Sequence, residues 1–345
     1  MTGNDTSWAD FSGTENPFGT PESFINALAD AAATRAISYQ PDTSARAFKR
    51  ALSSTLMLPE ETILVGATVS NMISAVAQSF ESCTVGVMVP CPVEYVLAVT
   101  NTGHQIARIS GTSNFVAPDF ETAASQGERF QAAILSNPGF PTSRLLPRRI
   151  LDTYLETCDW VIVDERSIEL TLGGKSYASL VEDHRNLIVV QSFCDQYALP
   201  GAPVSYLVAH PDIIVEIERF YDATAISALP EVFAEPSVRE YPKLESVRQF
   251  LAGEIPWMQT MLSLIPGVDI FPAEANYVMC ALNEATSSSA ISNVNDLAEH
   301  LKDHRCIIRK LSNTPGIGNL GSFCVSVRTR QENLQLIEAL RAILA

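Results

Sequence analysis

The chain has 345 residues, 46% of them hydrophobic, so it is long and apolar enough to bury a large core and to form two domains. Its 39 acidic and 23 basic residues give a formal net charge of −16 at pH 7. An acidic surface repels phosphate backbones and anionic lipids, which argues against nucleic acid and membranes as partners.

The rest of the composition indicates a cytoplasmic protein. The seven cysteines are scattered and none forms a Cys-x-x-Cys pair, so we expect reduced, buried thiols and neither disulfides nor a metal site. The first residues lack the basic and apolar regions of a secretory signal, and no apolar run is as long as a membrane span. We therefore expect a soluble protein of the cytoplasm.

Two motifs lie ahead of the first predicted strand. The segment Glu15-Asn16-Pro17-Phe18-Gly19 precedes a helix expected to begin near Pro21, and taken alone it indicates a turn. The segment Tyr39-Gln40-Pro41-Asp42 precedes a second predicted helix, over residues 45–52, which has helical apolar spacing. Taken alone, neither motif identifies a function.

From residue 63 to about residue 215, short apolar runs alternate with helical stretches, which predicts a mostly parallel sheet covered by helices. The predicted strands are residues 63–65, 85–89, 132–135, 160–163 and 186–190. Ligands of such sheets bind beyond the carboxyl ends of the strands. Asp164 and Asp195, which follow the last two runs, are therefore expected to face one cleft.

Beyond about residue 232 the pattern is mixed. Amphipathic spans over residues 244–264 and 295–304 flank strand-like runs at 275–279 and 322–327. A predicted helix from about residue 211 to 221 leads into this part of the chain, which we expect to be a separate small domain.

In this order, the motifs resemble those of the class I/II aminotransferases of pyridoxal phosphate (PLP) fold type I, especially the histidinol-phosphate aminotransferase and threonine-phosphate decarboxylase branch. The resemblance covers roughly residues 12–345. It implies a PLP-transferase-like α/β fold, with a mostly parallel seven-stranded sheet in the large domain and a smaller α+β domain. The implied division is an N-terminal arm and small-domain segment at residues 1–35, a large domain at 36–230 and a small C-terminal domain at 231–345.

The resemblance also implies roles for single residues. In the family, the Asn of the arm motif, here Asn16, contacts the substrate. The Tyr of the second motif, here Tyr39, reaches across a dimer interface, so a homodimer is implied. If PLP binds, the residues that the resemblance assigns to it are Thr68, Val69, Ser70, Asp164 and Ser192.

The chain departs from the family at the centre of the site. Asp195 stands where the Schiff-base lysine belongs, and Pro203 stands where a phosphate-binding arginine belongs. None of the chain's five lysines follows a core strand at the required place. The other departures are Pro92 for a stacking aromatic ring, Phe140 and Ser167 for two contacts to the phenolic oxygen, and Cys324 for the carboxylate-binding arginine. Because PLP chemistry needs an amine that forms an imine, we expect ordinary transamination to be lost and no cofactor to be used.

Three interpretations stay open. In the first, the protein performs PLP-independent acid–base chemistry on a small amino-acid-like or carboxylated metabolite, since two carboxylates in one cleft can have their pKa values pushed apart. The catalytic candidates are then Asp195, Asp164, Tyr95 and Cys194. The substrate-binding candidates are Asn16, Tyr39, Asn137, Phe140, Ser192, Arg309 and Arg328. In the second, the protein is a binding or regulatory relative without catalysis, and in the third it still binds PLP or pyridoxamine phosphate (PMP).

Overall fold

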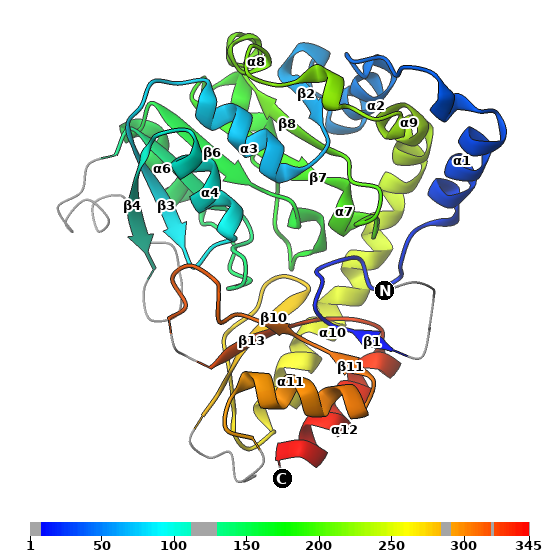
Figure 1. Ribbon diagram of the computed structural model, residues 1–345, viewed down its shortest axis with the longest axis vertical. Helices are drawn as coiled ribbons and strands as arrows, with labels where there is room; N and C mark the ends of the chain where they lie inside the picture. Colours follow the sequence, from blue (N-terminus) through cyan, green and yellow to red (C-terminus); the bar gives the residue numbers. More distant parts are fainter. Residues whose placement is uncertain (1–7, 112–129, 284–290, 319–320, 345) are drawn as a thin grey trace.

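The computed structural model describes residues 8–111, 130–283, 291–318 and 321–344. Figure 1 shows an upper body built on a seven-stranded sheet and a lower body built on antiparallel strands and the C-terminal helices. Helix α10 (Leu244–Ser263) runs from the upper body into the lower one. The mixture of a large α/β unit and a smaller α+β unit is the one expected from the sequence.

The large sheet has the strand order β2-β8-β7-β6-β5-β3-β4. Neighbouring strands are parallel except around β8, which is antiparallel to both β2 and β7. The strands are β2 (Ile63–Gly66), β3 (Thr84–Val89), β4 (Gln105–Ser110), β5 (Ala132–Ser136), β6 (Trp160–Asp164), β7 (Leu187–Ser192) and β8 (Ser205–Ala209). A mostly parallel sheet is thus confirmed, with β4 and β8 added to the predicted strands.

Both faces of this sheet are buried, because successive residues of a strand point to opposite faces. In β6, Val161 and Val163 belong to one hydrophobic core and Ile162 belongs to the other. The Ile162 face is covered by α3 (Val69–Gln78), α4 (Val93–Asn101) and α8 (Pro211–Glu218). The opposite face is covered by α2 (Arg46–Leu56) and α6 (Arg148–Thr157), together with other parts of the chain. The continuous apolar runs of the sequence are therefore strands buried on both sides.

The lower body contains a four-stranded antiparallel sheet in the order β12-β13-β10-β9. Its strands are β9 (Val268–Ile270), β10 (Tyr277–Leu282), β12 (Arg309–Lys310) and β13 (Ser322–Ser326), and two helices, α11 (Val294–Asp303) and α12 (Arg330–Leu344), accompany them. The N-terminal strand β1 (Ala9–Asp10) pairs in parallel with β11 (Cys306–Ile307). The N-terminal arm therefore begins on the small unit and runs up to the large one (Figure 1).

The strand predicted over residues 275–279 begins later, at Tyr277. Ala275 forms an isolated bridge with Thr171 instead, and the backbone N–H of Asn276 donates to the carbonyl of Leu170 at 3.0 Å. These backbone groups are paired with the segment that follows β6, so they cannot also join the small sheet. The two units are connected at this point.

Two expectations about the whole chain stay predictions. The proposed boundary at residue 35 falls just after α1 (Glu22–Ala33), and the one at residue 230 falls within the first turn of α9 (Leu229–Glu240). These two helices pack against each other through Phe24 and Phe233. The cytoplasmic location also stays a prediction. Within the described part of the chain, no helix combines the length and apolar character needed to cross a bilayer.

A buried ion pair joins α10 to α12 and gives a test of the small unit. Glu254 is 3% exposed and accepts hydrogen bonds from the guanidinium of Arg330 at 2.8 and 2.9 Å. The same guanidinium lies 3.8 Å from the ring centre of Trp257. We predict that Arg330→Ala lowers the free energy of unfolding in urea by roughly 2 to 3 kcal/mol, because a buried carboxylate loses its cation. Arg341→Ala, an exposed arginine of the same helix, is the matched control, and equal losses in the two variants would contradict the prediction.

Candidate functional site

A cavity of about 170 Å³ lies between the two units. It opens at the carboxyl ends of β5, β6 and β7, where ligands of parallel sheets are bound. The lining residues are Gly13, Thr14, Glu15, Pro92, Glu94, Tyr95, Pro138, Phe140, Asp164, Arg166, Ser167, Asp195, Tyr277 and Arg309. The arm, the large sheet and the small sheet all contribute to this cleft.

Asp164 ends β6 and is 2% exposed. Its Oδ2 atom accepts hydrogen bonds from Arg166 Nε at 2.8 Å, from Arg166 Nη2 at 2.5 Å and from the Tyr95 hydroxyl at 2.5 Å. Its Oδ1 atom accepts the backbone N–H of Arg166 at 2.9 Å. Both oxygen atoms of this carboxylate are therefore occupied by side chains and backbone of the chain itself.

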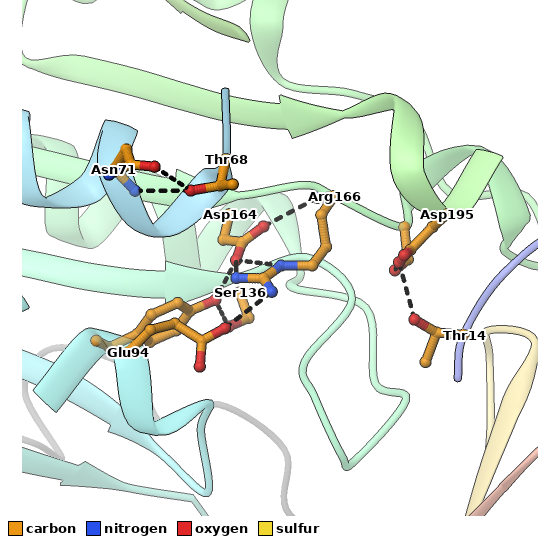
Figure 2. Close-up of polar contacts among 10 residues, drawn as sticks. Thr14, Thr68, Asn71, Glu94, Ser136, Asp164, Arg166 and Asp195 are labelled. Carbon is orange, nitrogen blue, oxygen red and sulfur yellow. Dashed lines mark hydrogen bonds and ion pairs between the residues drawn. The ribbon is translucent and has the colours of Figure 1, made fainter. Parts of the chain in front are cut away.

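Arg166 lies between two carboxylates (Figure 2). Besides Asp164, it donates from Nη1 to Glu94 Oε1 at 3.0 Å, across from α4. Burial and the nearby Asp164 charge raise the pKa of Tyr95 well above its ordinary value, so its hydroxyl stays protonated and donates. Glu94, Tyr95, Asp164 and Arg166 form one polar network, in which the positive charge of Arg166 is shared by Glu94 and Asp164.

Asp195 is placed differently. It lies in the short helix α7 (Phe193–Gln196) directly after β7 and is 8% exposed. Its Oδ2 atom accepts hydrogen bonds from the Ser167 hydroxyl and from Thr14 Oγ1, the latter at 3.0 Å (Figure 2). Burial raises the pKa of Asp195 from 3.8 to about 6, while the Ser167 hydrogen bond and the Arg166 charge lower it. This carboxyl can therefore gain or lose a proton near neutral pH.

The N-terminal arm is held against α7 by hydrogen bonds. The backbone N–H of Asn16 donates to the carbonyl of Asp195 at 2.8 Å, and Asn16 Nδ2 donates to the carbonyl of Gln196 at 2.9 Å. From the small unit, Asn276 Nδ2 donates to the carbonyl of Thr14 at 2.7 Å. The side chain of Asn16 thus binds backbone, and Thr14, which sequence reasoning did not single out, is the arm residue that touches Asp195.

Arg309 enters the cleft from β12. Its guanidinium lies 4.3 Å from the ring centre of Phe140, a cation–π contact. In the register of the small sheet, Arg309 is directly opposite Cys324 of β13, the position to which the motif resemblance assigns a carboxylate-binding arginine. The described residues contain no carboxylate in an ion pair with Arg309. It is thus a cation available to an anionic ligand.

Several predicted site residues lie outside the cavity lining. Asn137 Nδ2 donates to Glu165 Oε1 at 3.0 Å, and its Oδ1 accepts the backbone N–H of Leu146 at 3.0 Å. Ser192 caps α7 by accepting the N–H of Cys194 at 3.1 Å. Their roles as ligand-binding residues stay predictions, because the described contacts of Asn137 and Ser192 are structural.

Three more candidates are spread around the molecule. Cys194 is half-buried beside Asp195, and burial raises its pKa, so it is a protonated thiol at neutral pH. Arg328 donates to Glu332 at 2.8 Å within the start of α12. Tyr39 is 74% exposed and lies away from the cleft of its own chain. The cavity lining thus includes Tyr95, Phe140, Asp164, Asp195 and Arg309, and it does not include Cys194, Arg328 or Tyr39.

Comparison with known proteins gives the family. The family described as aminotransferase class I and II matches residues 6–340. The chain belongs to the class I and II aminotransferases. A putative threonine-phosphate decarboxylase of Caldanaerobacter subterraneus subsp. tengcongensis is 26% identical over 95% of this chain and 88% of its own length. A histidinol-phosphate aminotransferase of Roseiflexus castenholzii is 25% identical over 95% of this chain and 88% of its own length.

Solved structures of aminotransferases share the fold. The histidinol-phosphate aminotransferase of Clostridium acetobutylicum superposes with a TM-score of 0.85, at 21% identity over 97% of this chain and 98% of that one. The enzyme of Sinorhizobium meliloti, solved in complex with pyridoxal-5'-phosphate, gives a TM-score of 0.83 at 17% identity over 100% of this chain and 95% of that one. The PLP-transferase-like fold predicted from the motifs is confirmed.

These relatives correct one prediction. The sequence departures led us to expect that no cofactor is used. Relatives of this chain are named histidinol-phosphate aminotransferase and threonine-phosphate decarboxylase, and an aminotransferase with this fold was solved with PLP bound. The expectation of no cofactor was therefore wrong: it treated lost contacts as a lost cofactor, and PLP is the cofactor to expect of a member of this family.

The residues of this chain fit the phosphate group of PLP but not its covalent attachment. The first-turn N–H groups of α3 have no partner inside the helix, and Thr68 Oγ1 caps only one of them, that of Asn71, at 3.2 Å (Figure 2). Such a helix start can bind a phosphate. None of the chain's five lysines lines the cavity, however, and position 195 carries a carboxyl. Asp164, which would pair with the pyridine nitrogen, already binds Arg166. Covalent attachment therefore does not fit these residues.

The buried Asp195 predicts a pH-dependent stability. Its folded-state pKa lies above the unfolded value, so the protonated carboxyl favours folding at low pH, and this contribution is lost as the pH rises through about 6. We predict that Asp195→Asn gains stability relative to the parent, by roughly 2 to 3 kcal/mol, between about pH 4 and about pH 7. Urea unfolding across this range measures the difference.

The matched control is Asp183→Asn, which changes an exposed aspartate. Its stability should run parallel to that of the parent at every pH. A parallel curve for Asp195→Asn would show that the carboxyl of Asp195 has the same proton affinity in the folded and unfolded chain.

Proposed function

We propose that the cleft transfers protons to and from a small amino-acid-like or carboxylated metabolite, and that this chain has lost the lysine-dependent imine chemistry of its family. Asp195 is the group that gives and takes the proton. The observation that carries the proposal is the buried carboxyl of Asp195, with a pKa of about 6, which lines the cavity at the position of the family's lysine. A general acid or base works best when its pKa lies near the working pH.

The two aspartates of the cleft have different tasks in this proposal. Asp164 is held by Arg166 and Tyr95, so it is a positioning residue that fixes the network and keeps Tyr95 pointing toward it. Asp195 has hydroxyl donors, from Ser167 and Thr14, and no cation bonded to it among the described residues. When two carboxyl groups have such different surroundings, one can act as a general acid or base while the other stays ionised.

Arg309 is the proposed anchor for the carboxylate of the substrate. It occupies the cross-strand position opposite Cys324, so a guanidinium from β12 can serve the space that an arginine of β13 serves in the related enzymes. Phe140 stacks on this guanidinium and holds it over the cavity. The anchored anion and the proton-transferring carboxyl then face each other across the cleft.

A second candidate is a homologue that binds PLP or PMP without a covalent bond. The PLP-containing relative and the first-turn N–H groups of α3 favour it. Val69 and Ser70 would hold the phosphate through their backbone N–H groups. When bound, PLP supplies a ring that accepts negative charge from a substrate carbon. The residues of this chain would contribute the proton transfer through Asp195 in this case as well.

Proton exchange at carbon tests the proposal. We predict that the purified protein exchanges carbon-bound hydrogen of one or more amino acids or 2-oxo acids for deuterium in D2O, with a rate that changes near about pH 6. Asp195→Asn should lower this rate by about a hundredfold or more, because general acid–base groups contribute that much. Nuclear magnetic resonance follows the exchange, with and without added PLP and PMP, and Asp183→Asn is the control.

The outcomes separate the candidates. Exchange that needs added PLP or PMP supports the non-covalent cofactor. Full exchange in Asp195→Asn removes Asp195 from the proton transfer. Binding of ligands without exchange in any condition indicates a non-catalytic binding protein.

We also propose a cytoplasmic homodimer in which the Tyr39 segment serves the cleft of the other subunit. This is the arrangement of the related enzymes, and the 74% exposure of Tyr39 suits a side chain whose partner lies on another chain. We predict the mass of a dimer by light scattering at micromolar concentration. A monomer at that concentration would contradict the proposal.

A further inference from the structure

The cleft has more negative than positive groups. Its lining contains four carboxyl groups and two guanidinium groups. Arg166 is already bound by two of the carboxylates, those of Asp164 and Glu94. The lining groups left for a ligand are therefore the guanidinium of Arg309 and the carboxyls of Glu15 and Asp195.

Glu15 is a half-buried residue of the arm whose position is set by its backbone. Its carbonyl accepts Asn276 Nδ2 at 3.3 Å. Its side chain folds back over Gly13 so closely that a Cβ atom at Gly13 would lie 1.8 Å from Glu15 Oε2. Glu15 thus cannot retain this position beside any larger residue at 13. Within the described part of the chain, its carboxylate has no hydrogen-bond donor and no ion-pair partner.

Asp195 also has an unused oxygen atom. Oδ2 accepts both Ser167 and Thr14, whereas no donor to Oδ1 exists among the described residues. The residue is 8% exposed and lines the cavity. The charge of Glu15 is close enough to add to the effect of burial and raise the pKa of Asp195 further. Glu15 and Asp195 therefore share one side of the cavity.

We infer that Glu15 is a specificity-determining residue, which together with Asp195 binds an ammonium group of the ligand while Arg309 binds its carboxylate. This inference rests on the proposed function, because it assumes that the metabolite binds in this cleft. A zwitterion matches one uncommitted cation and two carboxyls. A phosphate ester adds a second, doubly charged anion, for which the cavity lining has no further uncommitted cation among the described residues, and the start of α3 is not part of that lining. The ligand is therefore an unphosphorylated amine that carries a carboxylate.

Matched probes test this charge pattern. The first group contains L-amino acids, among them L-threonine. Its members are compared with O-phospho-L-threonine and O-phospho-L-serine, which add a phosphate, and with 3-hydroxybutanoate, which is threonine without the amine. Dissociation constants come from nuclear magnetic resonance titrations of the full chain. We expect unphosphorylated amino acids to bind and both altered kinds of probe to bind more weakly.

Glu15→Gln keeps the size of the side chain and removes its charge. We expect this variant to bind the amino acids about two- to fivefold more weakly, which is the loss expected of a partly exposed charge pair, and to bind 3-hydroxybutanoate unchanged. Glu61→Gln, on the exposed surface before β2, is the control and should change neither affinity. Urea unfolding establishes that both variants are folded.

Three results would overturn the inference. These are tighter binding of a phosphorylated probe than of its parent, an equal effect of Glu15→Gln on all probes, and no binding of any amino acid. The proposed proton transfer fails separately, when Asp195→Asn retains full exchange. Loss of exchange in Asp195→Asn together with unaltered binding in Glu15→Gln would leave the function standing and the inference refuted.

Discussion

The cleft depends on the ion pairs that the guanidinium of Arg166 forms with Asp164 and Glu94. Arg166 comes two residues after the end of β6, turns back and binds Asp164 through two nitrogen atoms while also reaching Glu94 on α4. Without this cation, the buried carboxylate of Asp164 would face Glu94 with no compensating charge, which is costly in a partly desolvated site. Because Arg166 is used in this way, it leaves Arg309 as the cation directed at a ligand.

The scaffold of this aminotransferase relative is kept, and the proposal concerns only the polar groups that face its cleft. The fold superposes on solved histidinol-phosphate aminotransferases over nearly the whole chain. The sheet that builds the cleft depends on buried apolar strands, which tolerate changes in the polar residues at their carboxyl ends. The carboxyl of Asp195 is therefore accommodated directly after β7, in the short helix α7, which is capped by Ser192. A fold can retain the form of a cleft while the groups that face it change.

The arm connects this cleft to both units of the molecule. It starts in the strand pair with β11, is held by Asn276 of the small unit, and binds the backbone of α7 through Asn16. Thr14 and Glu15 reach Asp195 only because these backbone contacts fix the path of the chain. The environment of Asp195 is thus assembled from the arm, from Ser167 in the segment that follows β6, and from α7. This explains how a carboxyl on a four-residue helix becomes buried.

The sequence by itself determined the sheet and the family, and it singled out Asp195 as a residue of the predicted cleft. In a continuous apolar run such as Val161, Ile162 and Val163, successive side chains point to opposite faces of a strand, so both faces of that strand must be buried. The ordered motifs place Asp164 at the end of β6 and Asp195 shortly after β7. These are local properties, set by side-chain period and by spacing along the chain. The sequence also suggested that the cofactor was lost, which the family relationship corrects.

Only the tertiary structure decided which polar groups meet. No local pattern shows that Arg166 folds back onto Asp164, that Thr14 donates to Asp195, or that Arg309 lies opposite Cys324 on a neighbouring strand. Such contacts depend on how the arm and the small sheet pack on the large one. The same packing removes water from Asp195, and burial, which is a property of the whole fold, is what raises the pKa of its carboxyl.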